Sequence, residues 1–585
     1  MRDYVMLTWD TSDLAAGAQA EAIAAPLASS WRLEAREPGL LLLVPLDQPP
    51  AVRILQGGRL VLIGDYWSGD VEQIRGDPSV ASHQLSQGGW GRYAAIFRGA
   101  HGLAEAIYRD PSGGLDAIAW RRGGVGIVAS DLLADLDHAA PRALAIDWAV
   151  VGAALCDRMH LAGATPLVGL TTITPGGLRK LGGDKAETLI WRPDRFARLA
   201  LDDAVDRQVG LVAVIDSTIA ALTGRRSTLA EVSGGLDSAI VASSLVRART
   251  DVRAWLNYHV VDPHGDERTF ARAVARQNGF VLTEAVKADA GVDLGGLEHG
   301  SPSARPSFRL VDAAYDQDLA RRCRDLGVEQ IVTGLGGDVV FMQGGSRWLG
   351  GDYLRHTPPW RWRPKALMEI ARRAQTSVWR AARLGLAGAV GLGYPTSPPP
   401  RHLTAVAIAA ARRRPPPLWR KALAGLTPTK RAQVEGLARV LLVTGRSARS
   451  SVADVVNPLL AQPVMEATLS LSSLTLTQGG DDRAFARAAF ADRLPPLVRD
   501  RRSKGDLSRH YGQALARDLP QLRDLLLDGA LAEAGLLRRD VVDAMLTPEH
   551  LIWSDPYRDI IGMVVMELWV RSWRSRLVRL GYGNI

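Results

Sequence analysis

The chain has 585 residues, of which 47% are hydrophobic and 23% charged, and its formal net charge is +9. This is an ordinary globular composition in a chain long enough for two large domains. Two cysteines, Cys156 and Cys323, are too few for a disulfide framework, which fits a reducing compartment. The first residues lack the basic and apolar regions of a signal peptide, and the apolar stretch 384–394 is too short and too glycine-rich to span a bilayer. We therefore expect a cytoplasmic protein without a membrane span.

Short strand-like runs dominate roughly the first 195 residues. Turn signals separate these runs, and this pattern is typical of a β-rich sandwich. The predicted strands cover residues 4–9, 40–45, 60–66, 91–98, 104–109, 117–121 and 124–130. We place a first domain at residues 1–195 and a second at residues 200–585.

A glycine turn joins a predicted strand at residues 227–232 to a predicted helix. The turn reads Ser233-Gly234-Gly235-Leu236-Asp237-Ser238. It directs free backbone N–H groups and the positive end of a helix at one small volume, which suits a phosphate chain. The glycines permit close approach, the serines add donors, and Asp237 can hold Mg²⁺ on the phosphates. A structural N-cap is the simpler alternative. Because the turn lacks both the Walker lysine and a third dinucleotide glycine, it indicates neither kinase-like nor hydride chemistry.

A second glycine turn follows the predicted strand 330–333. It reads Gly334-Leu335-Gly336-Gly337-Asp338, so that Asp338 also follows glycines at the carboxyl end of a strand. One Gly-Gly-Asp is usually only a turn. Two aspartates at the ligand-binding edge of one sheet are suited to sharing Mg²⁺.

Strands and helices alternate between the two glycine turns. The sequence predicts strands at 252–260 and 280–286 and helices at 266–277 and 311–326. This alternation predicts an α/β fold with a parallel, doubly wound sheet and right-handed crossovers.

Basic residues concentrate in an expected helical insertion at about residues 345–450. About twenty Arg and Lys residues stand there against three acidic residues, with two proline clusters and several tryptophans. A solvated basic helix face is the simplest interpretation, and basic stripes with tryptophan can also indicate nucleic acid. We expect instead a surface that attracts an acidic peptide or partner protein, and no nucleic-acid partner.

A charged run at residues 499–506 contains Lys504. Standing alone, such a run is usually a solvated loop. In this chain it follows the segment 457–466 and the helix-like segment 481–490.

Taken in order, these motifs resemble those of the asparagine synthetase-like family. The first glycine turn is similar to the PP-loop of ATP pyrophosphatases, which split ATP into AMP and pyrophosphate to adenylate a substrate. The resemblance implies that Asp237 and Asp338 hold Mg²⁺ and that Asp338 and Lys504 are catalytic. Lysine suits this role because pyrophosphate departure and the tetrahedral intermediate concentrate negative charge. The implied ATP-binding residues are Val232, Ser233, Gly234, Gly235, Asp237, Ser238, Gly334 and Gly337.

The N-terminal domain resembles the Ntn-hydrolase-like, class II glutamine amidotransferase half of the same family. The segments 109–114, 128–132 and 169–177 carry this resemblance. In that half, a cysteine exposed by removal of the initiator Met hydrolyses glutamine to supply ammonia. Position 2 of this sequence is Arg2, so we expect a degenerate domain without a thiol nucleophile. The amine must then arrive on the substrate itself.

Within the family, the chain is most similar to lasso peptide cyclases. The segments 85–98, 336–338, 458–463 and 503–505 carry this similarity. It implies an ATP-dependent macrolactam synthetase, which adenylates an Asp or Glu side chain of a ribosomal precursor peptide and closes an isopeptide ring with the peptide's N-terminal amine. It also implies a leader peptidase and a leader-recognition protein as partners. The alternatives are a β-lactam synthetase-like or other amide synthetase acting on a small molecule, and an RNA-modifying PP-loop enzyme.

Leu335 departs from the family pattern. In asparagine and β-lactam synthetases the residue three before the second aspartate is a glutamate or tyrosine that serves as a base. Leucine cannot accept a proton, so the base must lie elsewhere, or a substrate phosphate or water must substitute. Glu369 is one candidate, although a solvated helix-face carboxylate is the simpler interpretation. We expect Glu267 to be structural.

Overall fold

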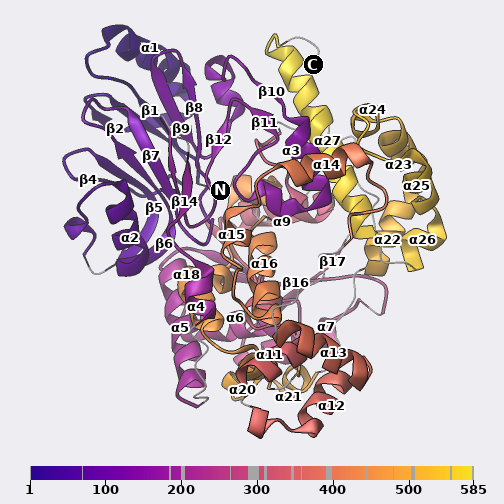
Figure 1. Ribbon diagram of the computed structural model, residues 1–585. Helices are drawn as coiled ribbons and strands as arrows, with labels where there is room; N and C mark the ends of the chain where they lie inside the picture. The colour runs from indigo at the N-terminus through magenta and orange to yellow at the C-terminus, as the bar shows by residue number, and fades with distance from the viewer. Residues whose placement is uncertain are drawn as a thin grey trace.

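The computed structural model combines an N-terminal part built on two antiparallel sheets with a C-terminal part built on a parallel sheet and many helices (Figure 1). It describes residues 2–68, 70–182, 186–198, 205–263, 265–287, 302–308, 312–343, 348–357, 359–389, 398–442, 445–478, 480–501, 508–553 and 557–582. The mixed α/β class expected from the sequence is therefore confirmed.

Two six-stranded antiparallel sheets form the N-terminal part, in the orders β12-β8-β9-β1-β3-β2 and β14-β13-β7-β6-β5-β4. The first contains β1 (Val5–Thr8), β2 (Trp31–Glu37), β3 (Leu40–Pro45), β8 (Ile118–Arg122), β9 (Val125–Ala129) and β12 (Thr171–Thr172). The second contains β4 (Val52–Leu55), β5 (Leu60–Ser68), β6 (Gly89–Arg98), β7 (Ala104–Arg109), β13 (Gly177–Lys180) and β14 (Glu187–Leu189). Every strand predicted in this region is present. The sequence did not reveal β2, because it is a largely exposed edge strand without apolar alternation.

Helices cover the outer faces of these two sheets. One hydrophobic cluster, which includes Met6, Leu42 and Ile96, fills the space between the sheets. Helix α1 (Leu14–Ala24) packs on the other face of the first sheet, and α2 (Pro78–Gly88) packs on the other face of the second. The result is a helix–sheet–sheet–helix arrangement. Successive side chains along each strand point alternately toward the other sheet and toward the covering helix.

The C-terminal part contains the predicted parallel sheet, with the strand order β17-β16-β15-β18-β19. Its strands are β15 (Thr228–Glu231), β16 (Val252–His259), β17 (Leu282–Val286), β18 (Gln330–Val332) and β19 (Asp454–Val456). Helices α6 (Leu236–Arg247), α7 (Arg268–Asn278) and α9 (Ala313–Leu326) provide the crossovers. The chain runs outward from β15 to β17 and then returns to β18 on the other side of β15. Ligands bind at such a switch point, at the carboxyl ends of the strands.

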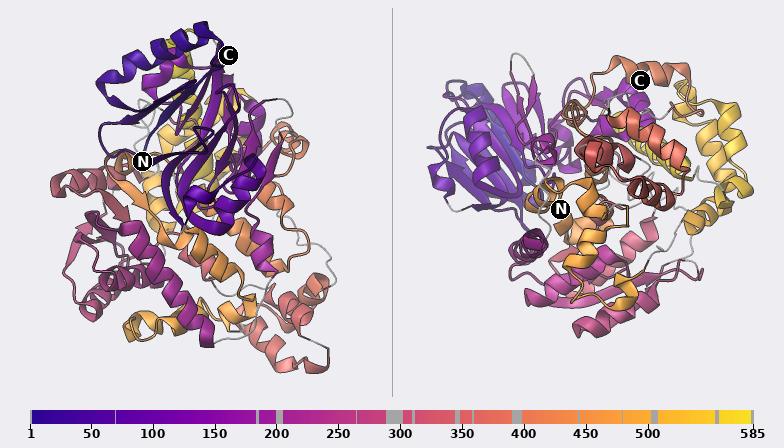
Figure 2. Two further views of the ribbon diagram at one scale, coloured as in Figure 1. Left: turned by 90° about the vertical axis from the view of Figure 1, so that its left-hand side faces the viewer. Right: turned by 60° about the horizontal axis from the view of Figure 1, so that its bottom comes forward.

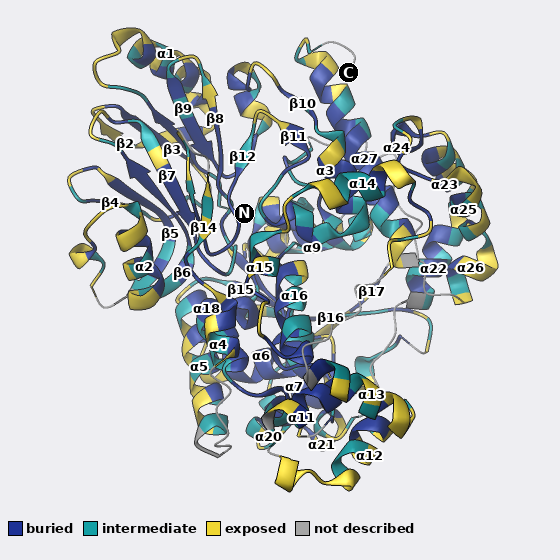
Figure 3. Ribbon diagram, viewed as in Figure 1, coloured by how far each residue is buried: buried dark blue, intermediate teal, exposed yellow. Residues whose placement is uncertain are grey.

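Helices account for most of the remaining C-terminal part, as Figure 2 also shows. Those in the expected insertion are α11 (Leu349–His356), α12 (Pro364–Arg373), α13 (Val378–Ala389), α14 (Ala405–Arg413), α15 (Leu418–Lys421), α16 (Pro428–Leu441) and α17 (Ala448–Val452). Figure 3 shows much of α12 in the colour of exposed residues, whereas the sheets are largely buried. No helix in the described parts of the chain is long and apolar enough to cross a membrane.

Candidate active site

The first glycine turn connects β15 to α6, as the sequence predicts. Gly234 has a φ of +87°, and a Cβ at this position would lie 2.7 Å from the backbone oxygen of Glu267. Both observations require glycine here. The Ser238 Oγ accepts a hydrogen bond from the Ser233 backbone N–H at 3.2 Å and lies 3.0 Å from the Ser233 Oγ. Gly235 is the N-cap of α6, so the positive end of that helix faces the turn.

The second glycine turn connects β18 to the short helix α10 (Gly337–Val340) and packs directly against the first. A Cβ on Gly334 would lie 2.7 Å from the backbone nitrogen of Ser238, and one on Gly337 would overlap the carboxyl group of Asp237. Glycine is needed at both positions, because the second turn meets the backbone of the first turn at Gly334 and the Asp237 side chain at Gly337. This packing places Asp237 and Asp338 on either side of one point.

Arg483 lies between the two aspartates. Its Nη1 is 2.9 Å from the Asp237 Oδ2 and 2.7 Å from the Asp338 Oδ1. The residue precedes helix α20 (Ala484–Ala489) and has a φ of +48°, in the left-handed region that non-glycine residues rarely adopt. Burial alone would lower the pKa of the guanidinium, but Asp237, Asp482 and Asp338 together raise it. Arg483 is therefore a permanent cation at this point.

The donor set at this point fits Mg²⁺. Because a single nitrogen contacts one oxygen from each carboxylate, the two oxygens are spaced to share a single small cation. Mg²⁺ usually takes one or two protein carboxylates and completes its coordination with water and substrate phosphates. Among the described residues, no group of three or more His, Cys, Asp or Glu side chains is arranged to hold a metal. Asp237 and Asp338 would thus hold a metal ion that is also bound by phosphates.

These residues line a pocket with a volume of about 310 Å³ at the carboxyl edge of the parallel sheet. Arg487 and Arg501 are among its lining residues. Arg487 donates hydrogen bonds to the carbonyl oxygens of Val498 and Arg499, at 2.9 Å each. Arg501 pairs with Glu267 at 2.8 Å and stacks over the ring of Phe270. Lys504 lies outside the described residues, three positions after Arg501. The two arginines make the pocket suited to polyanions.

A carboxylate network also borders the pocket. Glu231, the last residue of β15, accepts a hydrogen bond from the hydroxyl of Tyr315 and lies 3.5 Å from Arg449. Arg449 also pairs with Asp316. Burial, with the charge of Glu231, holds the pKa of Tyr315 well above its usual value, so its hydroxyl stays protonated. Among the described residues that line the pocket, Glu231 is the one carboxylate besides Asp237 and Asp338.

Residues 213–571, more than half of the chain, match the model of the protein family described as asparagine synthase. The chain belongs to the asparagine synthase family. Members of this family are ATP-dependent amide-forming ligases that typically use Mg²⁺, and the pocket lies within the matched region. A search of curated proteins finds no match.

The family base position is filled by the apolar Leu335, which lines the pocket. Its backbone N–H donates to the Thr333 Oγ1 at 3.1 Å. Glu369 is an exposed residue of α12 and is not among the residues that line the pocket. Glu267 holds Arg501, which agrees with a structural role. Sequence reasoning did not select Glu231 or Arg483. The one available signal for Glu231 was a carboxylate at the end of an otherwise apolar strand.

The remaining predicted ATP-binding residues also lie at the pocket or beside it. Ser233, Gly235, Ser238, Gly334 and Gly337 line the pocket. Val232 is buried, and its carbonyl oxygen accepts a hydrogen bond from the Asn257 side chain at 2.7 Å. That carbonyl therefore already has one partner within the protein.

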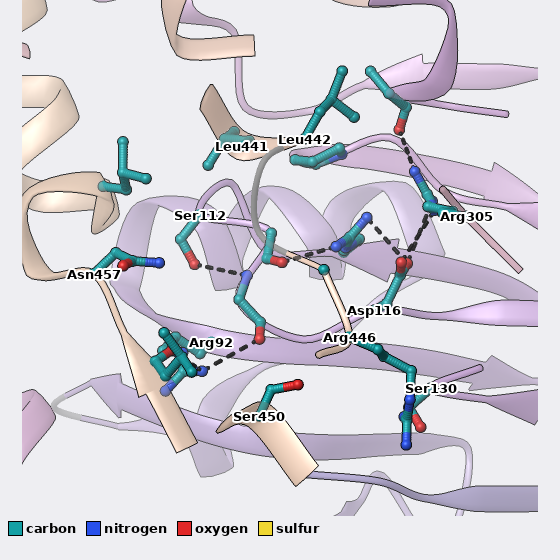
Figure 4. A pocket seen from close by; sticks show the side chains of 18 of the residues that line it. Arg92, Ser112, Asp116, Ser130, Arg305, Leu441, Leu442, Arg446, Ser450 and Asn457 are labelled. Atoms are coloured by element: carbon teal, nitrogen blue, oxygen red, sulfur yellow. Dashed lines mark hydrogen bonds and ion pairs between the residues drawn. The ribbon is translucent and has the colours of Figure 1, made fainter. Parts of the chain in front are cut away.

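A second cavity, of about 120 Å³, lies between the N-terminal sheets and the parallel sheet of this asparagine synthase family member (Figure 4). Arg92 projects from β6 and makes a two-pronged ion pair with Asp454 on β19, at 2.7 and 2.8 Å. Arg305 pairs with Asp116 at 3.1 Å on another wall. Burial would raise the pKa of Asp454, but Arg92, with Arg2, holds it far below its ordinary value.

The first residues of the chain also take part in this interface. Arg2 pairs with Asp65 of β5 at 2.7 Å and lies 3.5 Å from Asp454. Asp3 makes a two-pronged ion pair with Arg446, at 2.6 and 2.9 Å. The side chain at position 2 therefore joins the two parts of the molecule.

Proposed function

We propose that this chain is an ATP-dependent macrolactam synthetase acting on a ribosomally made precursor peptide. It activates the side-chain carboxylate of an Asp or Glu residue as an acyl adenylate and closes the ring with the peptide's own N-terminal amine. The fit of the two glycine turns and their aspartates to Mg-ATP, within a matched asparagine synthase region, supports the ligase chemistry. The peptide substrate goes beyond that match.

The observation that carries the choice of amine is the side chain of Arg2. Its guanidinium is a permanent cation without a thiol or hydroxyl, so it cannot act as the nucleophile that releases ammonia from glutamine. Ion pairs with Asp65 and Asp454 hold it in place. Neither cysteine of the sequence can replace it. Cys323 is buried in the core of the parallel sheet, and Cys156 contacts the backbone of Ala407. These observations support an amine that arrives on the substrate instead of one released from glutamine.

Activation takes place at the two glycine turns. The backbone N–H groups of the first turn and the N-terminus of α6 bind the triphosphate of the co-substrate ATP. Mg²⁺ held by Asp237 and Asp338 would neutralise the phosphate charge. A peptide carboxylate oxygen then bonds to the α-phosphorus, and pyrophosphate leaves toward Arg487 and Arg501. Lys504 stabilises the charge on the reacting oxygens.

Ring closure follows in the same pocket. The neutral N-terminal amine attacks the acyl carbon, the carbon–oxygen bond to AMP breaks, and the amine loses a proton. We assign that proton to Glu231, which is held at the pocket wall by Tyr315 and Arg449. Holding both ends of one peptide makes the encounter intramolecular, for which effective molarities reach about 10⁵ M or more.

The basic helical insertion suits an acidic peptide or partner protein. Helix α12 and its neighbours carry exposed arginine and lysine side chains, including Arg361, Lys365 and Arg372. Such a surface raises the association rate of an acidic partner and loses this effect in high salt. A leader peptidase and a leader-recognition protein would deliver the peptide with a free N-terminus.

The test combines the purified chain with Mg-ATP and a core peptide that has a free N-terminus. We expect AMP and pyrophosphate together with a peptide that has lost one water. The matched control peptide carries Asn or Gln in place of each acidic residue and should yield neither product. AMP release only with a small carboxylate and amine would instead favour a metabolite amide synthetase. Tight, strongly salt-dependent binding of transfer RNA without peptide turnover would favour the RNA-modifying alternative.

A further inference from the structure

The two magnesium carboxylates are already bridged by a cation of the protein itself. The Arg483 Nη1 contacts one oxygen of Asp237 and one of Asp338, at 2.9 and 2.7 Å. The guanidinium is almost completely buried, whereas the Asp338 side chain is 36% exposed at the pocket surface. Arg483 therefore occupies the point at which a shared metal ion would lie.

We propose that Arg483 is a resident counter-cation that keeps Mg²⁺ out of the site until ATP arrives. Without nucleotide, a metal ion would have to displace a buried guanidinium while gaining only two carboxylates. With nucleotide, the phosphates supply further oxygen ligands for the metal and a new anionic partner for the displaced arginine. Metal binding is thereby coupled to ATP binding.

The surroundings of Arg483 allow such an exchange of partners. Its backbone is left-handed, and nearby Gln478 and Gly480 also have positive φ values of 45° and 125°. Strained, non-repetitive backbone of this kind is common at sites that switch. Arg483 also pairs with Asp482 at 2.9 Å, which retains one partner for the guanidinium when the other carboxylates are taken.

The neighbouring arginine has a different set of partners. Arg487 lines the same pocket, but its described hydrogen bonds go to Asp482 and to the carbonyl oxygens of Val498 and Arg499. Neither Asp237 nor Asp338 is among those partners. Because the proposed function gives Arg487 a role in binding pyrophosphate, the control is taken outside the pocket. Arg493 pairs with Asp216 at 2.9 Å and is not among the residues that line the pocket.

The test measures Mn²⁺ binding to the full chain by electron paramagnetic resonance, first without nucleotide and then with a non-hydrolysable ATP analogue. Without nucleotide, we expect Arg483→Met to bind one Mn²⁺ at least about tenfold more tightly than the wild type, a difference of about 1.4 kcal/mol. The gain should disappear in the double variant Arg483→Met with Asp338→Asn. The control variant Arg493→Met should bind Mn²⁺ as the wild type does.

A second variant protects the test against a folding defect. Arg483→Lys keeps the charge but presents a single ammonium group, and we expect its nucleotide-free Mn²⁺ affinity to lie between those of the wild type and Arg483→Met. Circular dichroism and thermal unfolding check each protein. If a folded Arg483→Met variant gains no Mn²⁺ affinity, or if the wild type binds Mn²⁺ equally well with and without nucleotide, the proposal is wrong.

Because the proposal rests on the Mg-ATP chemistry of the proposed function, the analogue-bound wild type separates the two. If the wild type binds no Mn²⁺ even with the analogue, the ATP site itself fails. If it binds Mn²⁺ with the analogue but Arg483→Met shows no gain without it, only the role of Arg483 fails.

Discussion

Two arginine–aspartate clusters differ in their access to solvent. We interpret the accessible cluster as part of the active site and the inaccessible one as a structural contact. In the pocket, Arg483 bridges Asp237 and Asp338, and Asp338 remains 36% exposed. At the interface, Arg92 and Arg2 surround Asp454, which is only 4% exposed. The first cluster can exchange its cation for a metal ion and phosphates. The second is closed, so the same residue types only join two sheets.

The largest effect is expected when a carboxylate of the exposed cluster around Arg483 is neutralised. Asp338→Asn keeps the shape but removes a metal-binding charge, so we expect peptide-dependent AMP release to fall by at least about a thousandfold. The folded state should persist, because Arg483 keeps Asp237 and Asp482 as partners. Steady-state AMP release checks this. The matched control Asp251→Asn changes an exposed carboxylate that pairs only with Arg253 among its recorded ion pairs, and it should behave as the wild type.

The closed cluster should respond in the opposite way. Asp454→Ala leaves Arg92 buried without its carboxylate, which should lower the free energy of unfolding by about 3–5 kcal/mol. Urea unfolding at neutral pH measures the loss, with Asp251→Ala as the control.

The pKa of Asp454 gives the pH dependence of the same interaction. Because that pKa is lowered in the folded state, the stabilisation is present above the ordinary carboxyl value of about 3.9 and is lost as the pH falls below it. The stability gap between the wild type and Asp454→Ala should therefore be constant from pH 7 to about 5. A gap that shrank over this range would contradict the account.

The Glu231 network tests whether a carboxylate at the pocket wall acts in chemistry. Glu231→Gln should slow amide formation by about a hundredfold or more, because the amide cannot accept the proton of the amine. Adenylate formation, trapped with hydroxylamine, should change much less. Equal losses in both steps would show that Glu231 only maintains the structure. Tyr315→Phe removes one hydrogen bond to Glu231 and should have a smaller effect of the same kind.

The last prediction concerns Lys430, a buried cation that has no carboxylate in hydrogen-bonding contact among the described residues. Its Nζ donates to the Gln433 side chain and to the carbonyl oxygens of Thr468 and Leu469. Burial lowers its pKa to about 7, against the opposing charge of Asp352.

Because that pKa lies below the unfolded value, the unfolded chain binds more protons between about pH 7 and 10.4, and the free energy of unfolding should rise with pH over that range. Lys430→Met should remove this rise in urea unfolding curves. If the free energy of unfolding of Lys430→Met rose with pH as it does in the wild type, this assignment to Lys430 would be wrong.

The local order of strand, glycine turn and helix was sufficient to predict that Asp237 and Asp338 lie close together, because parallel strands bring their carboxyl ends to one edge. Arg483 was not predictable in this way. It is far from both aspartates in the sequence, and only the packing of α20 brings it between them. Strand β19 was missed for a related reason, since the helical insertion separates it in the sequence from its neighbour β18. The sequence shows a carboxylate at the end of β15, Glu231. Its partners Tyr315 and Arg449 could not be predicted, because they lie on helices that are distant in the sequence.

The central claim is that the pocket joins a peptide carboxylate to AMP before the amine attacks. The most direct measurement uses a core peptide whose acidic side chain carries a heavy oxygen isotope. We expect one labelled oxygen to appear in AMP for each ring that closes, as read by mass spectrometry. Label in inorganic phosphate, or ring closure with unlabelled AMP, would contradict the account.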